Sequence, residues 1–402
     1  MKILAFGDCI LHTTGYGRVS RNVLGYFVSQ GHEVIQIAWN YTLPPQRYPI
    51  IKDGTQLVGY INLVPPHTRD EFSTATVIHY INGIKPDMVY NSNDYFTIKP
   101  LLDKKNEWNH IPKITNYGII DGPECAQVYS SLITQIDYPV SPSKYGYNQL
   151  SKITNRGLYI PHGVDTATYK PLPNKEEIKK KLGLEGKFVF GTLNRNIWRK
   201  MYPLLFRAYA EIKHKLKDSC LFILADPNDI AGHGLAFWLK HFNLSASQDP
   251  KKPADVMFHP AYLNILMNLS DQELAEAYNA FDVFVSTSMS EGFGLATIES
   301  QACGIPSIMP NNTANTELVD GHGWLYDIAK NKDGTPVYIP PTIPLNWITY
   351  SYEMPDIACL KESMIEAYNS PDKVRSFGNA SHEFAQQYEW NKVLEGWKAV
   401  LR

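Results

Sequence analysis

The sequence predicts an α/β protein made of two doubly wound domains, and three observations indicate this fold class. Apolar runs at residues 2–7 and 33–39 flank an amphipathic segment at 15–30, the strand-helix-strand order that opens a parallel sheet. A polar stretch with prolines, residues 165–175, interrupts the alternation, which restarts at 188–193. A chain of 402 residues is long for one hydrophobic core and comfortable for two.

The first predicted domain, residues 1–168, continues the alternation after its opening unit. Short apolar runs bounded by turn residues are typical of buried strands, and longer runs with a period of 3.6 residues are typical of helices. By these patterns, strands are expected at 87–91, 113–119, 138–141 and 157–160, and helices at 70–83, 123–133 and 144–151.

The second predicted domain, residues 169–385, repeats this architecture. Strands are expected at 188–193, 221–225 and 281–288, and helices at 203–216, 235–241 and 271–279, the last with Ser270 as its N-cap. Residues 333–355 are rich in proline and indicate an irregular insertion. The segment 371–402 predicts two helices.

The composition is that of an ordinary globular protein, with 44% hydrophobic and 19% charged residues, so no long disordered stretch is expected. The formal net charge of −2 gives no indication of nucleic acid or an anionic membrane as a partner. Five cysteines without C-x-x-C spacing indicate reduced thiols and no zinc site. Neither a signal peptide nor a transmembrane segment is predicted, which indicates a cytoplasmic location.

The most informative segment for function begins at Glu291. This glutamate and Glu299 bracket seven residues and follow an apolar run that predicts a strand. Gly292 and Gly294 leave the loop backbone bare, and residues 293–303 predict a helix. A helix start offers unpaired N–H groups and the positive end of the helix dipole, so a phosphate site is expected. The glutamate spacing alone is weak, because helix surfaces commonly carry such pairs.

The whole string Glu-Gly-Phe-Gly-Leu, a second Glu, then Ala-Cys-Gly-Ile-Pro resembles the E-x7-E signature of retaining GT-B glycosyltransferases of family 4, the glycosyltransferase group 1. The resemblance covers nearly the whole chain and is densest at 274–318. It implies two Rossmann-like domains that face a cleft, with a C-terminal helix, 386–402, that packs back on the first domain. It also implies transfer of a hexose or related sugar from a nucleotide diphosphate sugar to an acceptor hydroxyl, with retention and without a metal or other cofactor.

The resemblance also assigns roles to individual residues. Glu299 is expected to bind the donor ribose and Glu291 to lie beside the transferred sugar, while amides and cations hold the diphosphate. Glu291 is not expected to act as a nucleophile. The expected catalytic residues are Glu291, Arg195, Lys200 and Asp121, and the expected donor-binding residues are Gly15, Gly17, Arg195, Lys200, Glu291, Gly292, Phe293, Gly294, Leu295 and Glu299.

The basic pair after the strand at 188–193 has two interpretations. Arg195 and Lys200 would neutralise charge on a departing diphosphate, but a solvated, basic helix start explains the same residues without a ligand. Similar proteins carry Arg and Lys at this spacing, which favours the first interpretation. Arg199 makes the assignment of Lys200 less exclusive, and Met201 stands where many of these proteins have glycine.

Three positions in the first domain stay ambiguous from sequence. Gly15 and Gly17 would let a backbone approach a phosphate or sugar, but a strand-helix turn also needs glycine, and the dinucleotide fingerprint is incomplete. Asp121 either forms a turn before Gly-Pro or lies near the transferred sugar, where many similar proteins have histidine. His162 is a candidate general base, although a turn at the domain junction is the simpler explanation.

Other functions agree less well with the sequence. A GT-B phosphorylase, a nucleotide-sugar epimerase, a glycosyltransferase acting on modified DNA bases and a non-enzymatic sugar-binding protein are the alternatives. No lysine context suggests pyridoxal phosphate, and no Asp-x-Asp or His-Glu-x-x-His string suggests a metal site. The acceptor would be a glycan, a lipid-linked sugar or another hydroxyl compound, and residues 256–262 are a candidate lining of the nucleobase pocket.

Overall fold

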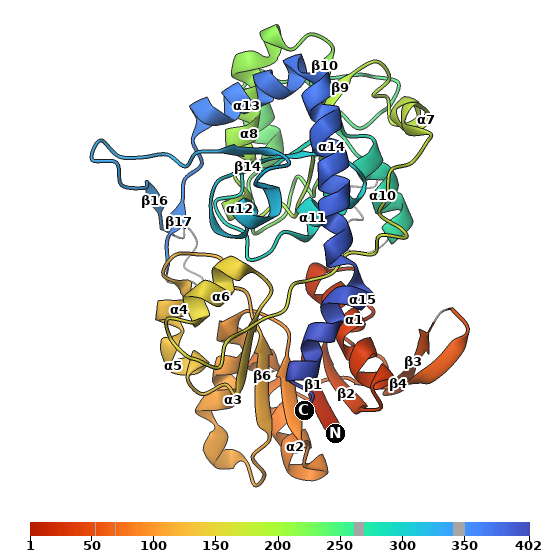
Figure 1. The fold of residues 1–402 in the computed structure, drawn as a ribbon, viewed down its shortest axis with the longest axis vertical. Coiled ribbons are helices and arrows are strands. Elements are labelled where there is room, and N and C mark those ends of the chain that lie inside the picture. Colours follow the sequence, from red (N-terminus) through yellow and green to blue (C-terminus); the bar gives the residue numbers. More distant parts are fainter. Residues whose placement is uncertain (53, 69, 261–268, 341–349) are drawn as a thin grey trace. The chain divides into compact units, whose positions relative to one another are not determined.

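The computed structural model describes residues 1–52, 54–68, 70–260, 269–340 and 350–402, which form two compact units (Figure 1). Unit 1 comprises Met1–Gly163 and Trp390–Arg402, and unit 2 comprises Val164–Glu389. Each unit is built around its own sheet with helices on it, so the predicted α/β class with two doubly wound domains is confirmed.

The sheet of unit 1 has eight strands in the order β3-β4-β2-β1-β5-β6-β7-β8. All neighbours are parallel except β3 and β4. The strands are β1 (Lys2–Asp8), β2 (Glu33–Trp39), β3 (Gln46–Lys52), β4 (Gln56–Val64), β5 (Met88–Asn91), β6 (Lys113–Tyr117), β7 (Tyr138–Ser141) and β8 (Leu158–Tyr159). The helices are α1 (Gly15–Ser29), α2 (Thr74–Ile84), α3 (Lys99–Asp103), α4 (Cys125–Val128), α5 (Ser130–Ile133) and α6 (Lys144–Leu150).

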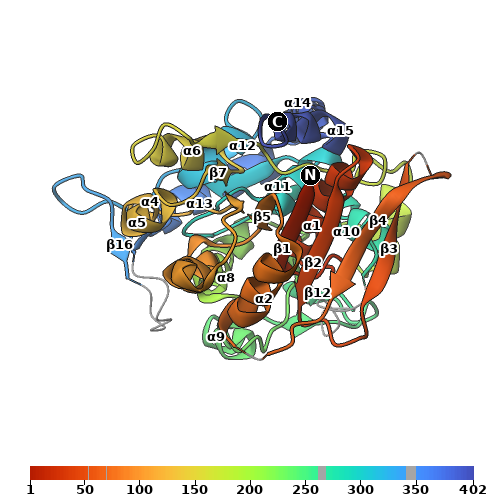
Figure 2. The ribbon, with the colours of Figure 1, turned by 90° about the horizontal axis from the view of Figure 1, so that it is seen from below.

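The hairpin of β3 and β4 is absent from the sequence prediction. β3 contains Pro49, which argues against a strand in the middle of a sheet but is tolerated at an edge. The hairpin does lie at the sheet edge (Figure 2). Ile51 and Leu57 on it are about half exposed. β3 is largely exposed and lacks the apolar alternation by which sequence patterns reveal a strand, whereas β4 buries Ile61 and Leu63 in its second half.

The C-terminal tail belongs to the core of unit 1. It forms the short helix α15 (Trp390–Val393) and a 3₁₀ segment, Leu394–Ala399, in place of the second of the two helices predicted for 371–402. Trp397 is 1% exposed, and its ring centroid lies 5.4 Å from Phe27, 5.6 Å from Tyr90 and 4.9 Å from Tyr117. The tail therefore fills a space over the sheet, next to α1.

The sheet of unit 2 has seven parallel strands in the order β11-β12-β10-β9-β13-β14-β15. They are β9 (Phe188–Leu193), β10 (Ser219–Leu224), β11 (Ala246–Ser247), β12 (Val256–Phe258), β13 (Val283–Val285), β14 (Ser307–Pro310) and β15 (Trp324–Tyr326). The helices are α7 (Lys175–Lys181), α8 (Tyr202–Ile212), α9 (Leu235–His241), α10 (Asp271–Asn279), α11 (Leu295–Ala302), α12 (Thr313–Val319), α13 (Ile357–Asn369) and α14 (Pro371–Ala385).

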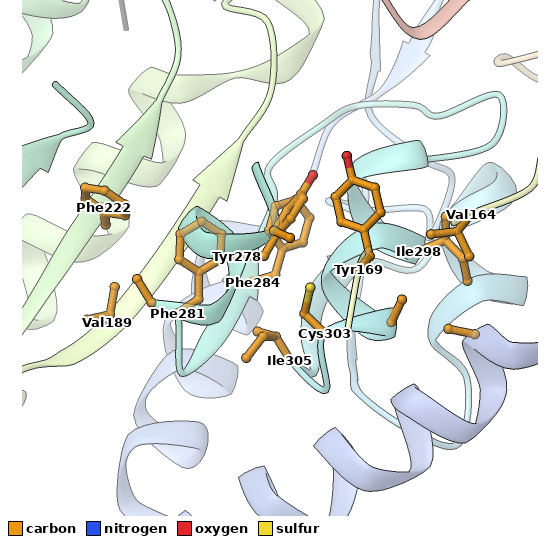
Figure 3. Packing of buried hydrophobic residues seen from close by; sticks show 14 of the residues in the cluster. Val164, Tyr169, Val189, Phe222, Tyr278, Phe281, Phe284, Ile298, Cys303 and Ile305 are labelled. Atoms are coloured by element: carbon orange, nitrogen blue, oxygen red, sulfur yellow. The ribbon is translucent and has the colours of Figure 1, made fainter. Parts of the chain in front are cut away.

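The segment 165–175, predicted as a linker, follows directly after the boundary between the two units, and one buried side chain anchors it on unit 2. Tyr169 is 2% exposed, and its ring centroid lies 6.0 Å from that of Tyr278. Figure 3 shows both rings among the buried side chains of unit 2. The Leu172 backbone N–H donates to Asn279 Oδ1 at 2.8 Å. The prolines and polar residues, which predict an exposed connection, thus flank one buried side chain, that of Tyr169.

The proline-rich stretch predicted as irregular contains one small element. β16 (Tyr338–Ile339) pairs antiparallel with β17 (Tyr352–Glu353), and residues 341–349 between them lie outside the described part. The ring of Tyr352 packs against Trp198 with centroids 5.2 Å apart. In the described ranges, no helix combines the length and apolar character that crossing a membrane requires.

Candidate active site

The loops that follow β9 and β13 in unit 2 leave the same edge of the sheet and are hydrogen-bonded to each other. β9 and β13 are parallel neighbours, so the loops that follow them start side by side. The Thr287 hydroxyl donates toward the carbonyls of Lys200 at 2.9 Å and Met201 at 3.0 Å. The Met289 backbone N–H donates to the Arg199 carbonyl at 2.9 Å. These bonds hold the loop that carries Arg199 and Lys200 against the residues that lead into the E-x7-E segment.

Glu291 lies between two cations at this junction. Lys200 Nζ donates to Glu291 Oε1, and Arg199 Nη1 lies 3.5 Å from Glu291 Oε2. The side chains are 9% exposed for Glu291, 10% for Lys200 and 19% for Arg199. Arg199 also donates to the Ser290 carbonyl, which fixes the guanidinium beside the carboxylate. The three buried charges form one cluster with an excess of positive charge.

The cluster keeps Glu291 ionised. Burial alone would raise the pKa of the Glu291 carboxyl, but the charges of Lys200 and Arg199 outweigh it and hold that pKa below its usual value. Backbone bonds fix the residue as well, because Glu291 N–H donates to Thr313 Oγ1 at 3.0 Å and its carbonyl accepts from Ala314 N–H at 3.2 Å.

The helix start predicted after the glycine loop is present. α11 begins at Leu295, two residues later than predicted, and Gly294 precedes it with φ of +109°. Only glycine adopts this backbone conformation without strain. The Thr297 and Ile298 N–H groups donate to the Gly294 carbonyl at 3.0 Å and 3.1 Å. The N–H groups before Thr297 come too early in the helix to have a carbonyl one turn back, so this end of the helix can receive an anion. Phe293 contributes its ring to the core, 5.8 Å from Tyr388, and Gly292 is buried beside it.

Glu299 lies on α11 and is 4% exposed. Its Oε2 accepts a hydrogen bond of 2.9 Å from the hydroxyl of Tyr278, on α10. The sequence did not single out Tyr278, because a tyrosine within an apolar helix face is usually a core residue.

Arg195 is paired with an aspartate of unit 2. Its guanidinium makes a two-point bond with Asp229, at 2.6 Å and 3.3 Å, and its side chain is 57% exposed. The structure thus brings Arg199 and Lys200 together at Glu291, whereas the sequence favoured Arg195 and Lys200. The adjacency of Arg199 to Lys200 was the available signal for this second cation.

The candidate residues of the first domain lie in unit 1. Thr14 caps α1 by accepting from Gly17 N–H at 3.0 Å, and Gly15 is the first helical residue. A Cβ on Gly17 would lie 2.6 Å from the His12 carbonyl, so local packing is enough to require glycine there. Asp121 is buried after β6. The pKa of Tyr129 is raised, mainly because its hydroxyl is buried and further because of nearby groups that include Asp121.

Comparisons with known proteins give the chain's relatives. Residues 174–333 match the family model described as glycosyl transferases group 1. The chain is 30% identical over 175 residues to the Escherichia coli UDP-Gal:alpha-D-GlcNAc-diphosphoundecaprenol alpha-1,3-galactosyltransferase, covering 42% of this chain and 41% of that protein. It is 26% identical over 255 residues to the D-inositol 3-phosphate glycosyltransferase of Kineococcus radiotolerans, covering 61% and 51%. The chain therefore spans about half the length of these curated relatives.

Solved structures match the chain over its whole length. The Anabaena HepE structure in complex with UDP and glucose has a TM-score of 0.69 at 15% identity, with 100% of this chain and 99% of that chain covered. Sucrose-phosphate synthase from Thermosynechococcus elongatus has a TM-score of 0.72 at 15% identity, with 100% and 98% covered. The chain has the GT-B fold. Unit 2 carries the E-x7-E segment, Glu291 to Glu299. Residues 174–333, which match the group 1 family model, all lie within unit 2.

Metal ligation has no cluster to support it within the described residues. Those residues contain no group of three or more His, Cys, Asp or Glu side chains placed to hold a metal ion. All five cysteines are free thiols.

His162 of this GT-B chain is a buried neutral imidazole. The Tyr117 hydroxyl donates to the Ile160 carbonyl at 2.9 Å, so the 2.7 Å contact between His162 Nδ1 and that hydroxyl places the proton on Nδ1. Burial lowers the pKa of His162 from 6.5 to about 3.

The lowered pKa of His162 gives a pH dependence with a defined sign. Below pH 6.5 the unfolded chain binds a proton at this residue, whereas the folded protein does so only near pH 3, so acid destabilises the fold. We expect wild type to lose about 2 kcal/mol more unfolding free energy than His162→Gln between pH 7 and pH 5, measured by urea denaturation. His241→Gln, at an exposed histidine, serves as the control. Equal losses in wild type and His162→Gln would contradict the assignment.

Proposed function

We propose that this protein is a glycosyltransferase that moves a hexose from a nucleotide diphosphate sugar to an acceptor hydroxyl, with retention of configuration and without a metal ion. The observation that carries the proposal is Glu291 held between Lys200 and Arg199, immediately before the start of α11. Two cations and the N-terminal end of a helix belong to this segment and its neighbouring loop, which suits a ligand with negative charge next to a neutral, hydroxyl-rich part.

The chemistry follows from where charge develops. Cleavage of the bond between the sugar C1 and the diphosphate oxygen leaves negative charge on the diphosphate and positive character on the sugar. Lys200, Arg199 and the N–H groups of Phe293, Gly294 and Leu295 would stabilise the diphosphate, and that stabilisation lowers the barrier. Arg195 is bound to Asp229, so we assign the second cation to Arg199.

Glu291 would lie beside the transferred sugar and keep both cations oriented before the donor arrives. Its ionised carboxylate suits hydrogen bonds from sugar hydroxyls, and its pKa below the usual value excludes it as a proton donor near neutral pH. We assign it no nucleophilic role. The leaving phosphate would itself take the proton from the acceptor.

The relatives favour a uridine donor. The Escherichia coli relative is named for UDP-galactose, and the Anabaena structure with the same fold contains UDP. We infer that the acceptor is a glycan or a lipid-linked sugar and that unit 1, with Gly15, Gly17 and Asp121, supplies its binding surface. A cytoplasmic location stays a prediction from the sequence.

Nucleotide release from purified protein tests the proposal. UDP-, GDP- and ADP-sugars are each incubated with the protein, and free nucleoside diphosphate is measured alongside the melting temperature. We expect one donor class to raise the melting temperature, because a ligand that binds only the folded state stabilises it, and to be cleaved slowly even with water as the acceptor. Absence of both effects with all three donor classes would refute a glycosyltransferase.

The same reaction tests the finer parts of the proposal. We expect turnover to persist in excess EDTA, because Lys200, Arg199 and the helix start neutralise the diphosphate. We also expect proton NMR of the first product formed to show the donor's anomeric configuration. Loss of activity in EDTA that added Mg²⁺ restores would refute metal independence, and inversion at C1 would refute retention.

A further inference from the structure

Tyr278 is a rigid part of the core of unit 2. It lies on α10, which packs against α11, and its side chain is fully buried. Its ring centroid lies 6.0 Å from Tyr169 and 5.8 Å from Phe281, in edge-to-face arrangements that hold the ring in one orientation. In Figure 3 the hydroxyls of Tyr278 and Tyr169 point away from the apolar side chains such as Ile305.

The Tyr278 hydroxyl reaches the second glutamate of the E-x7-E segment. It donates to Glu299 Oε2 at 2.9 Å inside the protein, with Glu299 itself 4% exposed. The charge of Glu299 also acts on Cys303, the residue one turn further on that ends α11. The pKa of the Cys303 thiol is raised mainly by burial and further by the Glu299 carboxylate. Glu299 is therefore a buried carboxylate whose orientation is set by a fixed phenol.

This bond has a consequence for ligand recognition. A carboxylate has about four lone-pair positions, so Glu299 can accept from Tyr278 and also accept from a ligand, while the bond to Tyr278 restricts rotation of the carboxylate. Two vicinal hydroxyls of a ribose need both carboxylate oxygens at a defined angle. A carboxylate free to rotate would lose conformational entropy on binding, which weakens the ligand.

We propose that Tyr278 is a positioning residue that orients Glu299 to accept hydrogen bonds from the 2′- and 3′-hydroxyls of the donor ribose. The inference rests on the proposed function, which places the nucleotide diphosphate sugar at α11. It adds that ribose recognition comes from a pair of residues on two helices, and that the specificity for a ribonucleotide depends on the phenol as well as on the carboxylate.

The proposal is tested by combining a substitution at Tyr278 with removal of the ribose hydroxyls from the nucleotide. UDP, GDP and ADP, and their 2′,3′-dideoxy forms, are titrated against wild type and Tyr278→Phe by calorimetry. For the nucleotide that wild type binds, we expect Tyr278→Phe to weaken binding of the ribonucleotide about tenfold, the loss of one hydrogen bond to a charged group. We expect less than about a twofold effect on the dideoxy form, because the hydroxyls that Glu299 would accept from are absent.

A matched tyrosine provides the control. Tyr169 packs against Tyr278, but its hydroxyl donates to Asp271 Oδ1 at 3.0 Å, so Tyr169→Phe removes the hydroxyl of a neighbouring buried tyrosine and leaves the bond from Tyr278 to Glu299 in place. Tyr169→Phe should leave binding of both nucleotide forms unchanged. Glu299→Gln should reproduce the pattern of Tyr278→Phe.

The outcomes separate this inference from the proposed function. Equal weakening of the ribonucleotide and its dideoxy form by Tyr278→Phe would show a merely structural role and overturn the inference, with nucleotide binding intact. Unchanged binding of the ribonucleotide would overturn it as well. Failure of wild type to bind any of the three diphosphates would instead overturn the proposed function, and the inference with it.

Discussion

Replacing Lys200 by methionine is expected to lower kcat for sugar transfer by about 10²–10³-fold, the usual effect of removing one preorganised charge donor from a transition state. Lys200 is 10% exposed and bonds directly to Glu291, so its charge acts in a site that excludes water. Methionine keeps the length and the apolar stem of the side chain. Turnover of the donor selected by the nucleotide screen, measured at saturation, gives the result.

The control for Lys200 separates catalysis from folding. Lys213 makes a comparable bond of 3.0 Å with Asp255, so Lys213→Met also removes a partly buried lysine, and it should leave kcat within about twofold. Glu291→Gln provides a second test and should lower kcat to a similar extent, because this carboxylate orients Lys200 and Arg199. Because it leaves Lys200 and Arg199 without their carboxylate, it should in addition destabilise unit 2 by about 3–5 kcal/mol. Near-normal kcat in both site variants, with melting temperatures unchanged, would refute the assigned site.

Replacing Trp397 by alanine is expected to lower the unfolding free energy of unit 1 by about 3–5 kcal/mol. The indole is buried among Phe27, Tyr90 and Tyr117, and alanine would leave a cavity that rigid strands cannot close. Urea unfolding followed by far-UV circular dichroism measures the change. The expected result is an earlier transition for unit 1 than in wild type.

The neighbouring residue offers the matched control for Trp397. Lys398 is about half exposed and pairs with Glu395 at the surface, so Lys398→Ala should change stability by less than about 0.5 kcal/mol. If Trp397→Ala unfolds at the same urea concentration as wild type, the tail does not contribute to the core of unit 1.

Sequence patterns located much of the fold because they report local physics. Apolar strands and amphipathic helices at the start of each domain appear as predicted, since burial on a sheet demands that periodicity. The edge strand β3 was not predicted, because Pro49 and its exposed residues give no such pattern. The predicted linker 165–175 follows the boundary between the units, but its prolines and polar residues do not reveal that Tyr169 is buried in unit 2.

The candidate site likewise has a part that the sequence predicts and a part that only the tertiary structure shows. By itself the sequence determined that Glu291, the glycine loop and a helix start follow one another at a strand end, because a strand, a loop and a helix are consecutive in the chain. Only the tertiary structure decided which cations and donors reach the carboxylates. Arg199 meets Glu291 while Arg195 meets Asp229, and Tyr278 meets Glu299 across 21 residues. These partners come from different elements, and only the packing of strands and helices sets their separation and orientation.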